Sequence, residues 1–150
     1  MGVITASDTR TVESDESGRL IRTMLAAAGH EVAYYEIIRD EPAQIAQAIN
    51  QQLARLDGII INGGTGIAAR DSTFEAVRSL LDKELPGFGE LFRMLSYQEI
   101  GSAAFLSRAT AGIRAGKIVV SIPGSPDACR LALEKLLIPE LGHIANLLNL

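Results

Sequence analysis

The sequence contains few of the residues from which disulfides, metal clusters and nucleic-acid-binding surfaces are built. Among 150 residues there is one cysteine, Cys129, and only two histidines, so an internal disulfide is impossible and a Cys/His metal cluster is not expected. Tryptophan is absent and aromatic residues make up 5%. Fourteen Lys and Arg residues against 18 Asp and Glu residues give a net charge of −4, which argues against nucleic-acid binding by a basic surface. Any anionic ligand must therefore be bound by local donors.

Long hydrophobic runs are also missing. No segment approaches the roughly 20 apolar residues that span a bilayer. The beginning of the sequence does not have the pattern of a signal peptide, because Asp8 and Arg10 follow only a few apolar residues. We therefore expect a cytoplasmic protein without membrane contact. No linker, repeat or low-complexity tract interrupts residues 1–150, so we expect one domain over this length.

Strands alternate with helices in the first half of the chain. Apolar, β-branched runs predict strands at 2–6, 32–38 and 59–61, and a helical pattern follows each of them. Ser72 and Glu75 have the spacing of a capping box for the third of these helices. The β-α-β-α-β-α pattern predicts a parallel sheet with helices on both faces.

The second half of the chain is less regular and is rich in glycine. We expect a helix around 90–97, a short strand at 109–113 and a hairpin turn at 114–116 that leads into a strand at 117–122. Ser125 is expected to cap the last helix, which is broken near a proline. The predicted fold class is thus α/β, with a mostly parallel sheet and one antiparallel pair.

Polar loops follow four of the predicted strands. In parallel sheets ligands bind beyond the carboxyl ends of the strands, so these loops should meet on one edge. Together they supply glycines for close backbone approach, hydroxyls, arginines for anions and carboxylates for a metal. The four loops are 7–10, 39–42, 62–71 and 123–126.

The loop after residues 58–61 is the most informative of the four. Its Gly63, Gly64, Thr65 and Gly66 can direct backbone N–H groups at a phosphate or another anion. The same glycines could instead form only a tight turn. The loop does not match G-x-G-x-x-G, and the segment 112–117 has one residue too few between its glycines for a P-loop. Known nucleotide motifs therefore do not identify the ligand.

Two aspartates on these loops are candidate metal ligands. Asp40 could alternatively cap the second helix. Asp71 stands one residue outside a helix whose cap position is already taken by Ser72, so we expect it to have no capping duty. Its alternative role is an ion pair with Arg70 or another arginine.

The sequence resembles the molybdenum cofactor biosynthesis family that includes MoaB, MogA and the gephyrin G domain. Residues 62–73, Asn-Gly-Gly-Thr-Gly-Ile-Ala-Ala-Arg-Asp-Ser-Thr, are similar to the Thr-Gly-Gly-Thr-Gly…Arg-Asp-x-Thr signature of that family. Asn62 stands where threonine is usual. Within the family the sequence is most similar to the MoaB branch, on Arg70-Asp71 and residues 96–101. Further matching segments follow in the same order along essentially the whole chain: 2–10, 40–42, 86–94 and 122–126.

The resemblance implies a molybdopterin-binding fold, a three-layer α/β/α sandwich that assembles into a homotrimer or homohexamer. It implies that the protein binds molybdopterin and adenylylates its terminal phosphate with Mg-ATP, releasing pyrophosphate. Two other functions remain open: a molybdopterin-binding homo-oligomer with little or no catalysis, and an interaction scaffold of the same fold. The apolar surface for assembly is expected in residues 86–105.

The resemblance also implies roles for individual residues. Asp40 and Asp71 match the two essential carboxylates and would hold Mg²⁺. Gly63, Gly64, Thr65 and Gly66 match the loop that binds phosphate. Ser7, Pro123, Gly124, Ser125 and Pro126 match positions that line the nucleotide and pterin pocket. Glu90, Met94 and Ser96 belong to the segment that would cover the pterin side.

Overall fold

Four parallel strands form the body of the sheet because their residues can be buried on both faces. The computed structural model describes residues 1–69 and 71–150. Strands β1 (Gly2–Ala6) and β3 (Gly58–Asn62) are buried at every position, and β6 (Lys117–Ile122) at all but its first. With β2 (Tyr34–Ile38) they pair in parallel, in a six-stranded sheet of order β2-β1-β3-β6-β5-β4. The parallel sheet predicted from the sequence is confirmed.

The other edge of the sheet is antiparallel. β5 (Thr110–Arg114) forms the expected hairpin with β6 through Ala115 and Gly116, both of which have positive φ. The short strand β4 (Lys83–Glu84) was not expected, and it pairs antiparallel with β5. Two exposed charged residues carry no hydrophobic alternation, so this strand leaves no pattern in the sequence.

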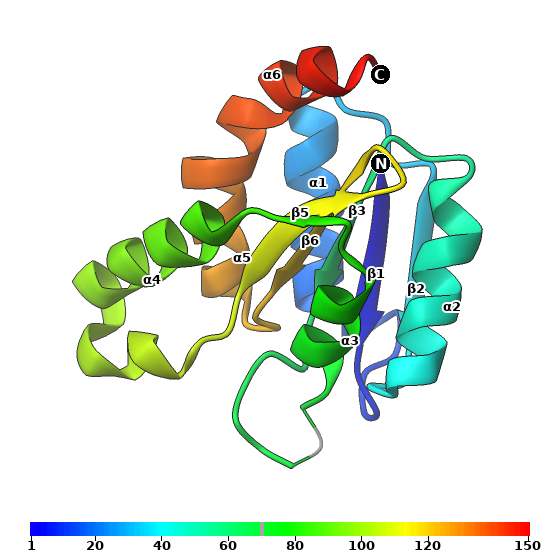
Figure 1. Cartoon of the computed structure of the whole chain (residues 1–150). Helices are drawn as coiled ribbons and strands as arrows, with labels where there is room; N and C mark the ends of the chain where they lie inside the picture. The colour runs from blue at the N-terminus through cyan, green and yellow to red at the C-terminus, as the bar shows by residue number, and fades with distance from the viewer. Residues whose placement is uncertain (70) are drawn as a thin grey trace.

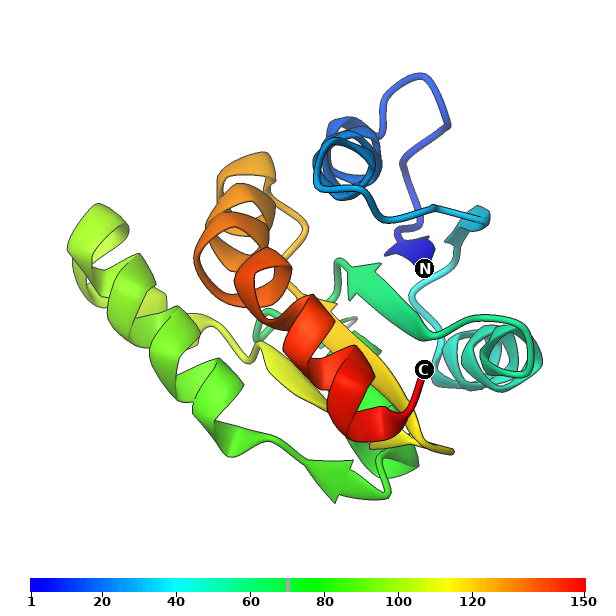
Figure 2. The same cartoon turned by 90° about the horizontal axis from the view of Figure 1, so that it is seen from above.

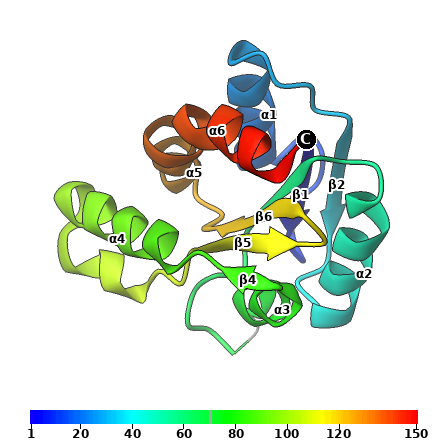
Figure 3. The same cartoon turned by 45° about the horizontal axis from the view of Figure 1, so that its top comes forward.

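Helices cover both faces of this sheet, as the layered view shows (Figure 3). α2 and α3 lie on one face, and α1, α4, α5 and α6 lie on the other. The predicted break near the last proline is a π-helical turn directly before α6, whose second residue is Pro139. The helical segments are α1 (Glu16–Ala27), α2 (Pro42–Leu53), α3 (Thr73–Leu80), α4 (Pro86–Ile100), the 3₁₀ segment η1 (Gly101–Leu106), α5 (Pro126–Ala132), the π segment η2 (Leu133–Leu137) and α6 (Ile138–Leu148).

The core consists of two apolar layers separated by the sheet. Alternate residues of β3 point to opposite layers: Ile60 packs with α1, α4 and α5, whereas Ile59 and Ile61 pack with α2 and α3. All three side chains are fully buried, and each contributes about 1.5–3 kcal/mol to folding. The two layers therefore fix the strands from both sides, and with them the loops that follow the strands.

The carboxyl ends of β1, β2, β3 and β6 lie at one edge of the sheet, and the two chain ends lie at the opposite edge (Figure 1). Seen from above, both chain ends face the viewer (Figure 2). Met1 and Leu150 line the same cavity of about 440 Å³ there. From β1 the chain goes to β2 on one side and then to β3 on the other, which creates the crevice where α/β sheets bind ligands.

Candidate functional site

A cavity of about 510 Å³, which we call the rim cleft, opens at the carboxyl ends of β1, β3 and β6. The loops after these three strands supply most of its wall, and Leu106 at the end of η1 and Ser107 after it close one side. The strands are adjacent in the sheet, so loops far apart in sequence meet here, as the sequence predicted. The described lining residues are Ala6, Ser7, Thr9, Arg10, Gly63, Gly64, Thr65, Gly66, Asp71, Leu106, Ser107, Pro123 and Gly124.

A smaller hollow of about 130 Å³, the carboxylate hollow, adjoins the rim cleft. Both candidate metal ligands, Asp40 and Asp71, line it together with Gly64 and Ser7. Ser7, Gly64 and Asp71 also line the rim cleft, so the two spaces share a wall. The structure thus brings together the two predicted carboxylates, a third from Asp8, and the glycine-rich loop.

The glycines of this loop are required by the backbone. Gly63 and Gly64 have φ of +113° and +56°, a region that residues with a Cβ rarely adopt. A Cβ on Gly64 would also overlap the carboxylate of Asp40, and one on Gly63 would overlap the carbonyl of Ala6. The Gly63 N–H donates to the Ile122 carbonyl at 3.0 Å, which ties the loop to β6. The loop is therefore a tight turn that also permits close approach to a carboxylate.

Asp40 supports the start of α3 from outside that helix. Its Oδ1 accepts hydrogen bonds from the Ser72 N–H at 3.3 Å, the Ser72 hydroxyl at 2.9 Å and the Thr73 hydroxyl at 2.9 Å. A negative charge is favourable at this positive end of the helix dipole. The alternative in which Asp40 caps α2 is wrong, because Glu41 occupies that cap position and α2 has no side-chain cap.

The predicted capping box at Ser72 and Glu75 is wrong. Ser72 is the cap residue of α3, but its side chain makes no capping hydrogen bond. The hydroxyl donates to Asp40 instead, and the Glu75 carboxylate pairs with Arg108. Stronger charged partners from other segments have displaced the local pairing that the spacing suggested.

Asp71 also has a local structural bond, contrary to the expectation that it is free. Its Oδ2 accepts from the Ala68 N–H at 2.9 Å, and its own N–H donates to the Ala68 carbonyl at 2.9 Å. This closes a turn at the end of the loop. The alternative ion pair with Arg70 involves a residue outside the described part of the chain.

Arg108 belongs to the site and was missed from the sequence. Its Nε donates to the Thr65 carbonyl at 3.2 Å and its Nη2 to the Asp71 carbonyl at 3.2 Å. The guanidinium also lies 5.1 Å from the ring centroid of Phe74. It therefore links the two ends of the glycine-rich loop. The separations of 43 and 37 residues gave no local signal for these contacts.

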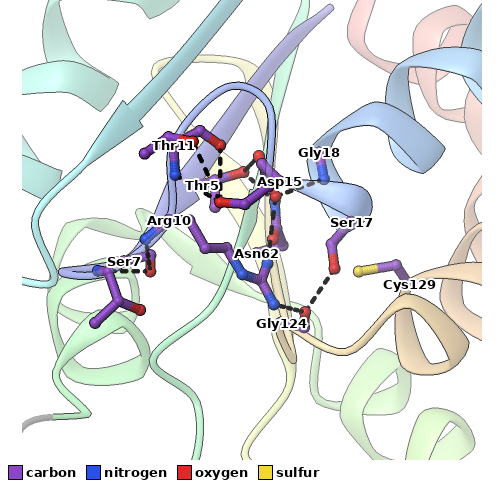
Figure 4. Close-up of polar contacts among 12 residues, drawn as sticks. Thr5, Ser7, Arg10, Thr11, Asp15, Ser17, Gly18, Asn62, Gly124 and Cys129 are labelled. Carbon is purple, nitrogen blue, oxygen red and sulfur yellow. Dashed lines mark hydrogen bonds and ion pairs between the residues drawn. The ribbon is translucent and has the colours of Figure 1, made fainter.

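A buried carboxylate, Asp15, joins the loops behind the rim cleft (Figure 4). It accepts from the Thr5 hydroxyl at 2.6 Å, the Tyr35 hydroxyl at 2.7 Å and the Gly18 N–H at 3.0 Å, and it lies 3.3 Å from Arg10 Nη1. Burial tends to raise the pKa of Asp15, but these hydrogen bonds and the arginine outweigh it and lower the pKa. Burial and the hydrogen bond to Asp15 raise the pKa of Tyr35 to about 12.

The carbonyl of Gly124 is a second point at which the loops meet. It accepts from Arg10 Nη2 at 2.7 Å and from the Ser17 hydroxyl at 2.6 Å (Figure 4). A Cβ on Gly124 would lie 3.2 Å from the Cα of Gly63, so the two loops are in direct contact. Cys129 is buried beside them, and burial raises the pKa of its thiol to about 12. The thiol has no nucleophilic character at neutral pH.

The side chain of Asn62 lies directly behind the site. Asn62 is fully buried, and its amide donates to the Thr5 hydroxyl at 2.9 Å and the Ile4 carbonyl at 3.3 Å. Among the described residues its Oδ1 has no hydrogen-bond partner. Asn62 therefore connects the ends of β1 and β3.

Several predicted site residues do not line the rim cleft. Ser125 caps α5 by accepting from the Ala128 N–H at 3.3 Å, and Pro126 is the first residue of that helix, so the cap prediction is confirmed. Ser96 is buried within α4 and is not among the lining residues, and the same holds for Glu90 and Met94 on that helix. Pro123, Gly124 and Ser7, in contrast, do line the cleft.

Glycines with positive φ, two carboxylates and a guanidinium at the carboxyl edge of a parallel sheet define an anion-binding α/β domain. Residues 2–143 match the model of a protein family described as "Probable molybdopterin binding domain". The chain belongs to this family of molybdenum cofactor biosynthesis proteins, as its sequence motifs suggested. No helix in the described part is long and apolar enough to cross a membrane.

Similar proteins agree in sequence and in fold. The molybdenum cofactor biosynthesis protein B of Halalkalibacterium halodurans is 56% identical over 145 residues, 95% of this chain and 85% of that protein. A crystal structure of a molybdenum cofactor biosynthesis protein B has a TM-score of 0.96 at 53% identity, covering 99% of this chain and 94% of that chain. The tungsten cofactor synthesizing protein MoaB of Pyrococcus furiosus has a TM-score of 0.89 at 39% identity, covering 99% and 96%. The molybdopterin-binding fold is confirmed.

Proposed function

We propose that the protein binds molybdopterin in the rim cleft and adenylylates its terminal phosphate with Mg-ATP, releasing pyrophosphate. The observation that carries this proposal is the carboxylate hollow, in which Asp40 and Asp71 face the same space as Gly64 beside the larger cleft. Pterin binding is supported by the family to which residues 2–143 belong. The nucleotidyl transfer step rests on the two carboxylates.

The two carboxylates fit Mg²⁺ delivered with a nucleotide. Among the described residues, no hydrogen bond uses Asp40 Oδ2 or Asp71 Oδ1, so each carboxylate keeps an oxygen for a metal. The described residues hold no group of three or more acidic, His or Cys side chains that could bind a metal by themselves. Mg²⁺ needs no such group, since it is commonly held by one or two carboxylates together with phosphate oxygens and water. When bound, it would neutralise phosphate charge and align the attacking and leaving oxygens.

The protein's own groups would bind and orient the reactants. The rim cleft of about 510 Å³ has the size of a small-molecule site. Its glycine-rich loop can bring backbone N–H groups close to phosphate oxygens without interference from side chains. Arg108 holds both ends of that loop, which keeps Asp71 at a fixed distance from Thr65. Such preorganisation is the main contribution that a protein makes to phosphoryl transfer.

We also propose that the protein acts as a cytoplasmic homotrimer or homohexamer. Seven of the eleven exposed large hydrophobic residues of the described chain belong to α4, its N-terminal flank and η1. They are Leu85, Leu91, Met94, Tyr97, Ile100, Phe105 and Leu106. An exposed apolar face of this extent is characteristic of an assembly surface. It coincides with the segment expected from the sequence.

Adenylylation can be tested directly. Incubation with molybdopterin, ATP and Mg²⁺ should give adenylylated molybdopterin and pyrophosphate, both measured by chromatography. Asp71→Ala and Asp40→Ala should each reduce the rate on the order of a hundredfold or more, because they remove metal ligands. Asp127→Ala on α5, where the side chain is 88% exposed and outside the cleft, is the matched control and should leave the rate unchanged.

Two outcomes would contradict parts of this proposal. If the wild-type protein binds molybdopterin but forms no product, the protein is a molybdopterin-binding homo-oligomer without catalysis. If the product persists at the wild-type rate in Asp71→Ala, the assignment of that residue is wrong. Because Asp40 also supports α3, the unfolding temperature of Asp40→Ala must be measured before its rate is compared.

A further inference from the structure

Arg10 is the single cationic side chain among the described residues that line the rim cleft. The protein as a whole has a net charge of −4, and three carboxylates, those of Asp8, Asp40 and Asp71, line the adjoining hollow. The overall field therefore repels a phosphorylated ligand, and a local cation must offset it. Arg10 occupies the position at which such a cation would act.

The guanidinium has donors left over after its structural contacts. An arginine carries five N–H donors. Two are used by the protein, in the bonds from Nη1 to Asp15 and from Nη2 to the Gly124 carbonyl. The structure gives no other partner for the guanidinium among the described residues, and the side chain is 29% exposed. A guanidinium that is half-buried against the protein and open on its other side is suited to bind phosphate in two-point fashion.

The structure also fixes the orientation of this group. The Asp15 carboxylate is fully buried and is held by donors from β1 and the first turn of α1 (Figure 4). The Tyr35 hydroxyl on β2 is its third donor. The Gly124 carbonyl is held in turn by the Ser17 hydroxyl. Both acceptors of Arg10 are therefore rigid, and little side-chain entropy remains to be lost when a ligand binds.

Asp15 does not need Arg10 for its own stability. Three neutral donors already satisfy it: two hydroxyls and one backbone N–H, at 2.6, 2.7 and 3.0 Å. The arginine is the longest of its contacts at 3.3 Å and the only one that reaches the cleft. The arrangement is thus better explained as an acid that orients an arginine than as an arginine that neutralises an acid.

We propose that Arg10 binds a phosphate group of the ligand in the rim cleft, and that Asp15 is the positioning residue that holds its guanidinium in place. This rests on the proposed function only in that the ligand carries phosphate. The phosphate belongs either to the nucleotide or to the pterin, and both compounds present the same tetrahedral oxyanion to a guanidinium.

Binding measurements on each compound alone test the role of Arg10, since no reaction occurs with one substrate. Calorimetry with Mg-ATP and, separately, fluorescence titration with molybdopterin should show which affinity Arg10→Gln reduces. We expect a dissociation constant about tenfold to a hundredfold higher for one of the two, the effect of losing a charge-assisted hydrogen bond. Arg10→Lys should recover only part of the loss, because an ammonium keeps the charge without the planar two-point contact.

Arg130→Gln is the matched control. Arg130 lies on α5, pairs with Asp127 at 3.4 Å and does not line the cleft. Arg130→Gln removes the same charge as Arg10→Gln, but outside the cleft. The affinities for Mg-ATP and for molybdopterin should therefore stay at the wild-type value. The deficit of Arg10→Gln should shrink as salt is raised, since its side chain is partly exposed.

The role of Asp15 is tested by a double-mutant cycle. Asp15→Asn should weaken binding of the same compound, and it should have almost no further effect when combined with Arg10→Gln. A merely structural residue would weaken binding equally in both backgrounds. If Asp15→Asn does not fold, Tyr35→Phe removes one of its hydrogen bonds and serves in the same cycle.

The proposal is overturned if Arg10→Gln binds both compounds as tightly as the wild type, or if the wild type binds neither compound. It is also overturned if Arg10→Gln and Arg130→Gln lose affinity equally. A wild-type protein that forms no adenylylated product, while Arg10→Gln still loses affinity, contradicts the proposed catalysis and leaves this inference intact. The two hypotheses can therefore fail separately.

Discussion

Two buried or half-buried carboxylates at the carboxyl edge each accept hydrogen bonds from segments far apart in the sequence. Asp15 joins β1, β2 and α1, and Asp40 joins the loop after β2 to the start of α3. A buried charge is tolerated only where such donors replace its water. These two residues therefore stabilise the geometry of the site as well as the fold.

At this scale we expect Asp15→Asn to lower the free energy of unfolding by about 1–3 kcal/mol at pH 7, because the amide cannot accept all the hydrogen bonds that the buried carboxylate accepts. The folded-state pKa of Asp15 lies below its ordinary value of 3.8. Its charge therefore stabilises the fold fully above about pH 4, and this contribution is lost as the pH falls through the lower folded-state pKa. Urea unfolding of both proteins at pH 7, 5 and 3 measures the difference.

The difference between wild type and Asp15→Asn should narrow at pH 3. Asp127→Asn, which changes an exposed acid, should show little difference at any of the three values. If the difference in free energy of unfolding between wild type and Asp15→Asn stays constant from pH 7 to pH 3, the shape of the side chain rather than its charge explains the loss of stability.

Whether the role of a residue could be predicted depended on how far away in the sequence its contact partners lie. The glycine-rich loop and the Ser125 cap could be predicted, because their partners lie within a few residues. The burial of Asp15 could not, since Thr5 and Tyr35 lie 10 and 20 residues away. Arg108 was missed for the same reason.

At the scale of elements, α5 is a short helix that begins just after Pro123 and Gly124, which line the cleft. It has seven residues, and Ser125 satisfies one of its free N–H groups. Ser125→Ala should lower stability by about 1 kcal/mol, whereas Ser125→Gly should cost only a few tenths. For a protein of this size this corresponds to roughly 2–4 °C in the midpoint of thermal unfolding, which calorimetry resolves.

If Ser125→Ala is as stable as Ser125→Gly, the Ser125 side chain contributes no capping energy and the position tolerates either residue. Ser72→Ala is a useful comparison, because Ser72 occupies a cap position without side-chain capping. Any loss of stability in that variant would come from its hydrogen bonds to Asp40 instead.

Most helices and strands could be predicted, because each has the hydrophobic period of its own type. β4 is defined only by its main-chain pairing with β5, including the bond from the Leu85 N–H to the Ala111 carbonyl at 2.8 Å. The capping box failed because Asp40, 32 residues away, competes for the Ser72 hydroxyl. Contacts of this kind depend on the assembled fold and leave no local pattern.

At the scale of the whole molecule, the apolar face of α4 and η1 is unpaired in a single chain. We expect the wild type to elute as a trimer or hexamer, and Tyr97→Asp or Leu91→Asp to shift it toward the monomer. A charge placed in an apolar interface is left without a partner. Size-exclusion chromatography with light scattering measures the mass. Leu147→Asp on α6 is the matched control, since this residue is 69% exposed on another surface.

A wild-type monomer at micromolar concentration would contradict assembly. An unchanged mass in both α4 variants, with dissociation of Leu147→Asp, would move the interface to α6. The glycine and phenylalanine content of residues 86–105 was the basis for predicting an apolar surface in this segment. The mostly parallel sheet followed from the alternation of strands and helices, and its antiparallel pair from the hairpin turn at 114–116.

The position of the chain ends has a practical consequence. Met1 and Leu150 line one cavity at the amino-terminal edge of the sheet, on the far side of the molecule from the rim cleft. A polypeptide of residues 1–150 could therefore be cyclised by a short peptide linker without obstructing the ligand's access. Cyclisation would restrict the unfolded chain and leave the carboxyl edge of the sheet unaltered. The same arrangement allows the protein to be tethered to a sensor surface by either end with the cleft facing the solution.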